Sequence, residues 1–250
     1  MAGIQIKELS KSFNLNDCKI PALQGITLDI EEASFLTIVG KSGCGKTTLL
    51  RILSGLDEQT DGDIAFLKGK QPITSPKIAM VFQEPRLMPW LTVRDNMALS
   101  LIKDKDRKKV NERIDYYLNL LDLSSFQHAY PNQISGGMAQ RVALGRTLCY
   151  EPDIILMDEP LGALDIYNRK MLQDELIKVF NTCKKTIVFV THDIDEAIYM
   201  GQKVVVMNGG RIMDAIDIRR HHHVEIDEDT TKQLKSRLMT SIIAKNPNDQ

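Results

Sequence analysis

The segment GKSGCGKTT, residues 40–48, constrains this chain more than any other stretch of its 250 residues. It fits the pattern G-x-x-x-x-G-K-[ST], and it lies between an apolar run that predicts a strand (FLTIV, 35–39) and a run with helical spacing (TTLLRILSGL). In such a loop, backbone N–H groups point at phosphate oxygens, Lys46 adds a cation and Thr47 offers a hydroxyl to Mg²⁺. A glycine-rich turn that matches by chance is disfavoured, because strand, loop and helix are all in register.

Polar side chains follow three other apolar runs. Asp158 and Glu159 end IILMDE, His192 ends TIVFVTH, and Gln83 follows IAMVF. Because ligands bind at the carboxyl ends of strands in such sheets, we expect Asp158 to hold Mg²⁺ and Glu159 to polarise the attacking water. Taken alone, an acidic pair is usually a surface turn, a lone histidine is usually structural and a glutamine commonly ends a strand. Because a phosphate loop occurs in the same chain, we expect these side chains to form a functional site with it.

A second candidate phosphate-binding end lies downstream, in QISGGMAQRVAL (133–144). Ser135 can cap a helix there, and Gly136 and Gly137 leave backbone N–H groups exposed, which is the design of an anion-binding helix start. The chain therefore has two phosphate-binding ends but only one complete nucleotide site.

The order of apolar patterns predicts an α/β fold. The first thirty residues alternate apolar and polar side chains, which predicts antiparallel strands. Apolar runs at 77–82, 154–157, 186–190 and 203–207 alternate with helical patterns, which predicts a mostly parallel sheet covered on both faces. A helical insertion is expected from about 88 to 150, a hairpin at 204–214 and a short helix at 232–243.

Composition excludes some classes. A formal net charge of −1 gives no overall attraction to nucleic acid or anionic lipid. The four cysteines show no CxxC or zinc spacing, which favours a reduced, cytosolic protein. No apolar run approaches the ~18 residues of a membrane-spanning helix, so another chain would have to do the crossing.

Five motifs occur in the order GKSGCGKTT, VFQEPRLMPWLTVRDN, ISGGMAQR, IILMDEPLGALD and VTHDIDEA. Together they resemble the ATP-binding subunit of ABC transporters over residues 4–215, and the second and third are most similar to the nitrate/sulfonate/taurine importer branch. The resemblance implies an α/β P-loop NTPase fold, an ABC-type nucleotide-binding domain with an N-terminal antiparallel β subdomain and an inserted helical subdomain (88–150). Residues 216–250 would form a short C-terminal extension.

The resemblance also implies an ATPase that uses ATP and Mg²⁺. Its catalytic residues would be Glu159, His192, Lys46 and Gln83, and its metal ligands Thr47, Gln83 and Asp158. Phe13 matches the aromatic residue that stacks on adenine, and Leu161 to Asp165 match the D-loop. The other residues expected to contact nucleotide are Gly40, Lys41, Ser42, Gly43, Cys44, Gly45, Lys46, Thr47, Thr48 and, toward the ATP of an opposite subunit, Ser135, Gly136 and Gly137.

In this family two subunits dimerise head to tail, which would account for the second phosphate-binding end. The implied partners are a second copy of the chain, transmembrane permease subunits and, indirectly, a solute-binding protein, with no nucleic acid. The implied location is cytoplasmic, on the inner face of the cell membrane. Residues 84–96, with Trp90 at their centre, are expected to dock on the permease; the alternative is that Trp90 is local core of the helical insertion.

Some residues depart from the family pattern. The family's commonest signature is LSGGQ, but Ile134 and Met138 replace its leucine and glutamine, and Gln140 follows two positions later. Gly145 lies where family members usually have alanine, at a cost of roughly 1 kcal/mol in a helix. Glu32-Ala33-Ser34 stands where many members have a Gly-Glu turn.

The sequence disfavours two other functions. A non-transport ABC ATPase acting on DNA or the ribosome is disfavoured for three reasons. The segment between the two phosphate-binding ends is too short for a coiled-coil insertion, and the sequence has one nucleotide domain where ribosome-acting relatives have two. Its near-zero net charge also gives no sign of a basic nucleic-acid-binding surface. A binding-only subunit is disfavoured because Lys46, Asp158, Glu159 and His192 are all present. The histidines at 221–223 favour a solvated basic edge over a metal site, since neighbours on a strand point to opposite faces. Nothing in the sequence identifies the solute.

Overall fold

A computed structural model describes residues 1–15, 18–162, 164–218 and 227–244 of the chain. Its larger sheet has the strand order β10-β9-β3-β8-β7-β6, and every pairing is parallel except that between β10 and β9. The strands are rich in β-branched residues, as expected of a sheet buried on both faces: one face packs against a helix and the smaller sheet, the other against helices. They are β3 (Phe35–Val39), β6 (Ile78–Val81), β7 (Ile154–Asp158), β8 (Thr186–Thr191), β9 (Lys203–Asn208) and β10 (Arg211–Asp217). The predicted parallel sheet and the hairpin are confirmed.

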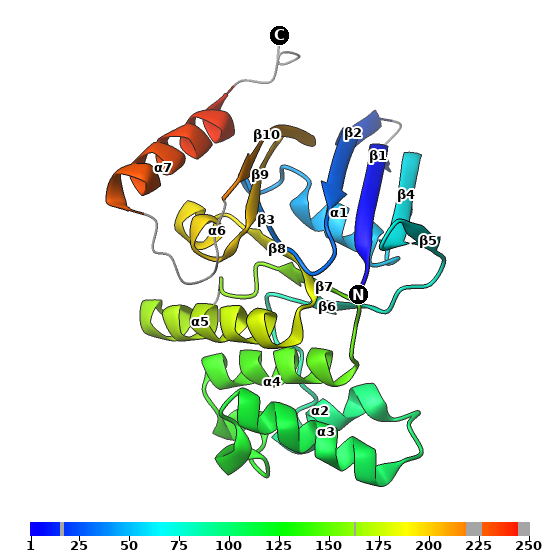
Figure 1. Cartoon of the computed structure of the whole chain (residues 1–250), viewed down its shortest axis with the longest axis vertical. Helices are drawn as coiled ribbons and strands as arrows, with labels where there is room; N and C mark the ends of the chain where they lie inside the picture. The colour runs from blue at the N-terminus through cyan, green and yellow to red at the C-terminus, as the bar shows by residue number, and fades with distance from the viewer. Residues whose placement is uncertain (16–17, 163, 219–226, 245–250) are drawn as a thin grey trace.

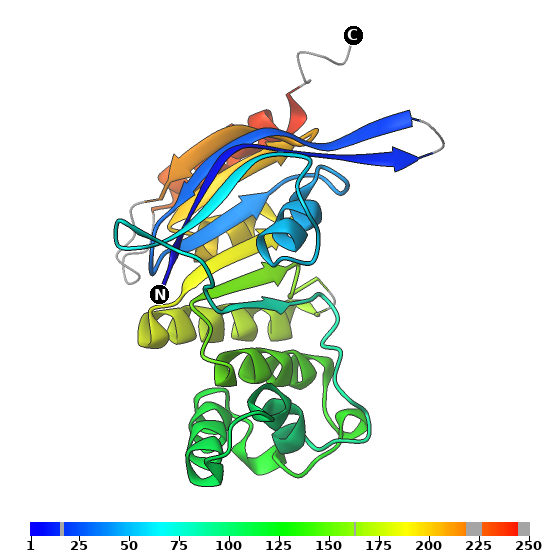
Figure 2. The same cartoon turned by 90° about the vertical axis from the view of Figure 1, so that its right-hand side faces the viewer.

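A second, four-stranded sheet is antiparallel and has the order β2-β1-β4-β5. It consists of β1 (Gly3–Leu15), β2 (Cys18–Ile30), β4 (Asp61–Lys68) and β5 (Gln71–Ile73). Helix α1 (Lys46–Leu53) lies between the two sheets, and its Leu49, Leu50 and Leu53 share one core with residues of β1, β2, β3 and β7. The distal part of the β1–β2 pair projects beyond the rest of the molecule (Figure 2).

Helices α5 (Ile166–Cys183) and α6 (Ile194–Met200) cover the other face of the larger sheet (Figure 1). The apolar side of α5 packs through Leu172, Leu176, Val179 and Phe180 against Phe35, Ile187 and Phe189 of the sheet. Phe180 and Phe35 meet edge to face, with ring centroids 5.5 Å apart. Helix α7 (Glu228–Ile243) packs on α6, β9 and β10 through the fully buried Leu238.

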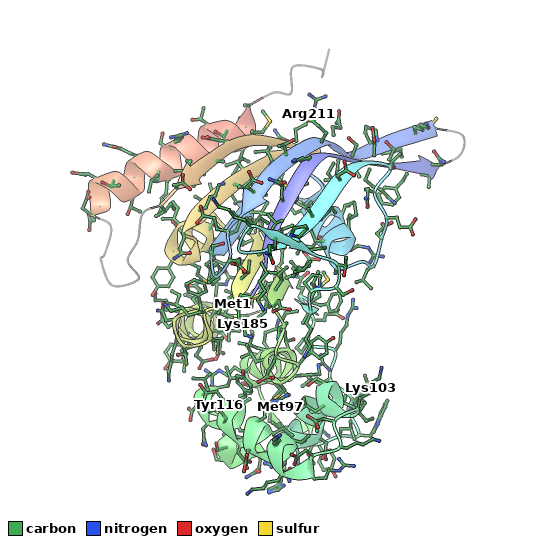
Figure 3. All side chains as sticks on the ribbon, turned by 45° about the vertical axis from the view of Figure 1, so that its right-hand side comes forward. Met1, Met97, Lys103, Tyr116, Lys185 and Arg211 are labelled. Atoms are coloured by element: carbon green, nitrogen blue, oxygen red, sulfur yellow. The ribbon has the colours of Figure 1, made fainter. Side chains whose placement is uncertain are left out.

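A helical layer continues the core beyond α5. It contains α2 (Val93–Ala98), η1 (Leu99–Leu101), α3 (Arg107–Leu120), η2 (Ser124–Phe126), η3 (Pro131–Gln133) and α4 (Gly136–Cys149). The apolar face of α3 is buried, and its members are Val110, Ile114, Tyr117 and Leu118, together with Leu121 just after the helix. Met97 and Tyr116 mark this layer at the end of the molecule away from Arg211 (Figure 3).

Helix α7 begins earlier than the expected residue 232. Asp227 accepts a hydrogen bond from the Thr230 N–H (2.8 Å) and starts the helix at Glu228, so the predicted start was wrong because the cap was overlooked. Residue 215 lies within β10, and Ile216 beyond it is buried. The division into residues 4–215 and 216–250 stays a prediction. Within the part of the chain that the structure describes, no helix has the length and apolar character needed to span a membrane.

Candidate functional site

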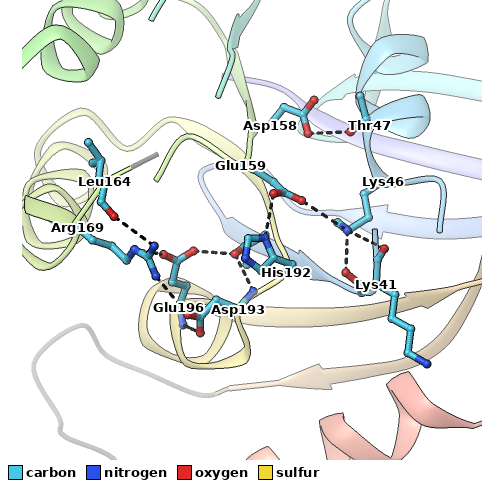
Figure 4. A network of polar contacts seen from close by, with 12 residues as sticks. Lys41, Lys46, Thr47, Asp158, Glu159, Leu164, Arg169, His192, Asp193 and Glu196 are labelled. Atoms are coloured by element: carbon cyan, nitrogen blue, oxygen red, sulfur yellow. Dashed lines mark hydrogen bonds and ion pairs between the residues drawn. The ribbon is translucent and has the colours of Figure 1, made fainter. Parts of the chain in front are cut away.

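The loop Gly40–Thr48, here called the phosphate loop, connects the carboxyl end of β3 to α1. Lys46 is 3 % exposed, and its ammonium donates hydrogen bonds to the Gly40 carbonyl (2.7 Å) and the Lys41 carbonyl (3.1 Å). These bonds keep the cation inside the curve of the loop (Figure 4). The lysine nitrogen is therefore fixed in place inside the loop, where a phosphate group would be bound.

Two glycines let the phosphate loop pack closely against its surroundings. A Cβ at Gly40 would lie 2.2 Å from the Met207 carbonyl oxygen, and Gly45 has φ +102 with a Cβ position 2.5 Å from the Ala22 carbonyl oxygen. The turn of the β9–β10 hairpin holds the same loop, because the Gly210 N–H donates to the Cys44 carbonyl (3.1 Å). The loop is therefore shaped by the fold before any ligand binds.

Cys44 fills space inside this loop. Its side chain is buried, and burial raises the pKa of its thiol. A thiol kept neutral and enclosed acts as a small apolar residue. Lys41, Ser42 and Gly43 are exposed, so they line the open side of the loop.

The carboxylate that ends β7 reaches the phosphate loop. The Thr47 hydroxyl donates to Asp158 Oδ1 (3.0 Å), and burial raises the pKa of Asp158. A hydroxyl and a carboxylate oxygen converge here, and oxygen ligands are those that Mg²⁺ prefers. These two residues fit the ion.

Glu159 joins the phosphate loop to the end of β8. Its Oε1 lies 3.7 Å from Lys46 Nζ, and its Oε2 lies 2.9 Å from His192 Nδ1. The backbone of Glu159 has φ +45, a left-handed conformation that is unusual for a non-glycine residue and occurs often at functional sites. His192 is 59 % exposed, so its ring faces solvent beside the carboxylate. A carboxylate, a cation and an imidazole thus meet at one edge of the sheet.

Gln83 and Phe13 lie outside this cluster. Gln83, exposed after β6, has its amide nitrogen 3.0 Å from the Cβ position of Gly162, next to the D-loop segment. Phe13 is half exposed on β1, with the Lys11 ammonium 5.0 Å from its ring centroid. An exposed aromatic ring on the projecting β1–β2 pair is available for stacking. Ala163 and the histidines at 221–223 lie outside the described residues.

Ser135, Gly136 and Gly137, here called the signature end, begin α4 in the helical layer. The Ser135 hydroxyl accepts a hydrogen bond from the Met138 N–H (3.2 Å). Nothing lies within 4 Å of a Cβ built on Gly136, so this end of the helix is open. Met138 packs against the larger core cluster, as does Ile134, so the side chains that replace the family's glutamine and leucine point into the protein.

Sequence reasoning missed the residues that anchor α4. The buried Gln140 donates to the Phe82 carbonyl (3.0 Å), and Arg146 donates to the carbonyls of Pro85 (2.9 Å) and Arg86 (3.0 Å). Both side chains therefore bind the signature helix to the backbone on either side of Gln83. The available signal was a glutamine on the apolar side of a predicted helix, which needs a partner when buried. The buried residues Thr191 and Glu196, beside His192, were missed in the same way.

Residues 84–96, the segment expected to dock on a permease, expose the tryptophan at their centre. Trp90 is 68 % exposed, which disagrees with the alternative that it is local core. The segment is nevertheless ordered by Asn96, which accepts from the Met88 N–H and donates to the Leu91 carbonyl. Its contact with a permease stays a prediction.

A glycine-rich loop after a central parallel strand, with a lysine, a carboxylate pair and a histidine at the same sheet edge, defines a P-loop ATPase. The comparisons narrow this class. A model described as "ABC transporter" matches residues 23–162. The chain belongs to the ABC transporter family and is an ATP-binding ATPase of that family.

Individual relatives cover most of the chain. The aliphatic sulfonates import ATP-binding protein of Bacillus subtilis is 44 % identical over 82 % of this chain and 78 % of that protein. Its counterpart from Bacillus anthracis is 40 % identical over 96 % of this chain and 94 % of that protein. A solved dimeric ATP-binding cassette, bound to ADP and Pi after hydrolysis, is 31 % identical with a TM-score of 0.75, over 87 % of this chain and 99 % of that one.

Proposed function

We propose that this chain hydrolyses ATP to power the import of a small solute, such as an anion of the sulfonate or nitrate type, through a permease formed by other chains. The observation that carries the proposal is the chain of contacts from Lys46 through Glu159 to His192, at the edge where the phosphate loop opens. The sequence identity of 40–44 % to the sulfonates import ATP-binding proteins of two Bacillus species supports import over export.

Each polar residue of the site has a separate task. Lys46, held by two carbonyls, stabilises charge on the terminal phosphates. Glu159 accepts a proton from the attacking water, and the imidazole of His192 fixes that carboxylate by a hydrogen bond. Thr47 and Asp158 would supply oxygen ligands for Mg²⁺, which when bound would neutralise charge on the phosphate groups. Gln83 is a further ligand candidate that would report contact with the permease.

The signature end completes the site of a second copy of the chain. Its exposed helix start offers backbone N–H groups and the Ser135 hydroxyl, which suit a terminal phosphate held mainly by another surface. The dimeric state of the related cassette supports a head-to-tail dimer. ATP then favours the closed dimer by binding both faces, and hydrolysis releases it.

The solute is proposed to be an aliphatic sulfonate or a related anion, with taurine, nitrate and vitamin precursors as alternatives. A solute-binding protein delivers it, and this chain works at the cytoplasmic face of the membrane through its permease. Disrupting the gene should abolish growth on an alkanesulfonate as sulfur source while growth on sulfate continues. Unchanged growth on alkanesulfonates would remove that solute class. A nucleic-acid-acting ATPase remains the disfavoured alternative.

The test of the site is Glu159→Gln. The variant should bind ATP·Mg²⁺ like the wild type, lose steady-state hydrolysis and accumulate as an ATP-bound dimer in size-exclusion chromatography. Glu112→Gln, an exposed change on α3, is the matched control. Turnover near the wild-type rate in Glu159→Gln would remove Glu159 as the base.

A further inference from the structure

The loop that carries His192 is held on both sides by one buried hydroxyl. Thr191, immediately before the histidine, is buried at the end of β8 and donates from Oγ1 to Glu196 Oε2 (2.6 Å). The same Oγ1 accepts a hydrogen bond from the N–H of Asp193, the residue after the histidine (3.0 Å). The path of the backbone through His192 therefore depends on the position of Glu196.

Glu196 is 6 % exposed on α6, and its carboxylate lies between Thr191 and an arginine from another helix. Burial raises the pKa of Glu196, which reflects the cost of keeping this carboxylate away from water. A buried carboxylate of this kind needs a cation and hydrogen bonds to stay ionised. The cation available is Arg169 of α5, whose Nε lies 3.6 Å from Glu196 Oε1.

Arg169 extends the network to the D-loop segment. Its Nη2 donates to the Leu164 carbonyl (3.3 Å), and its Nη1 lies 3.7 Å from Asp193 Oδ2. Its Nε is buried and makes no hydrogen bond to any described residue, because the Glu196 oxygen is too distant for one. Figure 4 shows Arg169 reaching from Leu164 toward Glu196 and Asp193, with His192 beyond them.

We propose that Arg169 and Glu196 are positioning residues that hold the His192 loop against the D-loop segment and so keep the imidazole aimed at Glu159. Neither belongs to the phosphate loop or to the cluster that would contact ATP. Arg169 and Glu196 nevertheless line the same small hollow as Glu159 and His192. The pair acts through the loop, and the inference rests on the proposed role of His192.

The alternative is that Arg169 and Glu196 only join α5 to α6 and contribute stability. The two cases differ in how mutations combine. A misplacement of about 1 Å in a reacting group can lower the rate ~100-fold, and this loss requires that the group be present. Loss of a purely structural contact instead has the same effect whether or not His192 is present. Coupling to His192 therefore separates positioning from packing.

The experiment is a double-mutant cycle on the full chain with ATP·Mg²⁺. Arg169→Met should lower kcat about tenfold or more while the KM for ATP changes less than twofold, because the side chain does not contact nucleotide. In a His192→Ala background, measured by single-turnover phosphate release, the same change should lower the rate less than twofold. An equal fold-loss in both backgrounds would overturn the proposal.

A second pair of variants keeps the test decisive if Arg169→Met fails to fold. Thr191→Ser retains the hydroxyl and should keep kcat within threefold of wild type, whereas the isosteric Thr191→Val should lose about tenfold. Equal kcat values for the two would contradict the role of the hydroxyl.

Arg237→Met is the matched control, because it removes an arginine that is paired to Asp214 of β10 (2.8 Å) and not to Asp193 or Glu196. The His192→Ala variant by itself separates failure of this inference from failure of the proposed function. If His192→Ala alone does not lower turnover, the proposed role of His192 fails. If His192→Ala lowers turnover but Arg169→Met acts additively with it, only the positioning inference fails.

Discussion

At the phosphate loop the chain surrounds the nucleotide position with its own charges, whereas at the signature end it offers a helix start and one hydroxyl. Lys46 is buried and linked to Glu159 at 3.7 Å, and Thr47 is bonded to Asp158. Ser135 is exposed and bonds only within its own first turn. We therefore propose that the first end binds ATP by itself, whereas the second adds contacts only to a nucleotide that another chain already holds. On this proposal the phosphate loop sets the affinity for ATP and the signature end sets the assembly of the dimer.

The largest expected effect comes from removing the cation of the phosphate loop. Lys46→Met should raise the dissociation constant of ATP·Mg²⁺ about 100-fold, since losing a charge-assisted contact costs ~2–3 kcal/mol. Isothermal titration calorimetry measures this constant. Lys108→Met, an exposed lysine on α3, is the matched control. Affinity retained in Lys46→Met would mean that the signature end contributes to binding in the monomer, which would break the comparison.

The next effect is confined to the signature end. Ser135→Ala should leave ATP affinity within twofold at low protein concentration, but should weaken ATP-driven dimerisation about tenfold. Loss of the cap costs ~1 kcal/mol of stability and removes a ligand from the opposite site. Analytical ultracentrifugation of the change in a Glu159→Gln background measures the assembly. A loss of monomer affinity equal to that in Lys46→Met would contradict the division of roles.

Mixing the two variants sharpens this prediction. In a head-to-tail mixed dimer, the Ser135→Ala chain supplies an intact phosphate loop and the Lys46→Met chain supplies an intact signature end, so one of the two composite sites is complete. The mixture should dimerise with ATP better than either variant alone, with one bound ATP per dimer. No gain on mixing would sink the shared-site arrangement.

The phosphate loop and its sheet edge could be predicted from the sequence because both depend on local patterns. Apolar runs fix the strands, and parallel strands place Gln83, Glu159 and His192 at one edge whatever the details of packing. The confirmed α/β fold follows from the same patterns. The roles of the individual site residues stay predictions.

The support of the signature end could not be predicted, because it depends on contacts between distant segments. Gln140 and Arg146 bind backbone carbonyls about sixty residues away in sequence, and carbonyl positions leave no mark in the sequence. Gly145 is a second example. A Cβ there would lie 2.7 Å from the terminal carbon of Met97, so the helix cost of this glycine is offset by room for Met97. Ala33 is a third, since it adopts φ +52, a left-handed conformation that alanine rarely takes and that its local sequence does not predict.

A smaller effect is expected from loosening α4. Burial lowers the pKa of Arg146, and the side chain donates to two carbonyls beside Gln83. Arg146→Met should leave ATP affinity unchanged and weaken ATP-driven dimerisation about fivefold, because these bonds orient the signature end and contribute ~1 kcal/mol.

The control for this change is Arg113→Met, which removes an arginine bond to the carbonyl of Cys149 at the other end of α4. It should affect dimerisation less than twofold in the same ultracentrifugation assay. Equal effects of the two variants would mean that α4 acts as a whole rather than through its anchor at Gln83.

The smallest expected effect comes from Asp214, whose substitution should lower stability without changing the phosphate loop or the signature end. Hydrogen bonds from Arg237 lower the pKa of Asp214 below its ordinary value of 3.8. A carboxyl whose pKa is lower in the folded chain stabilises it above the unfolded pKa, and this contribution is lost as the pH falls through the folded pKa. Asp214→Asn should therefore lower Tm by a few degrees at pH 7, and the difference should shrink below about pH 4. Circular dichroism at several pH values measures it. ATP affinity and dimerisation should stay at wild-type values, and a change in either would show that the two phosphate-binding ends respond to general stability rather than to their own ligands.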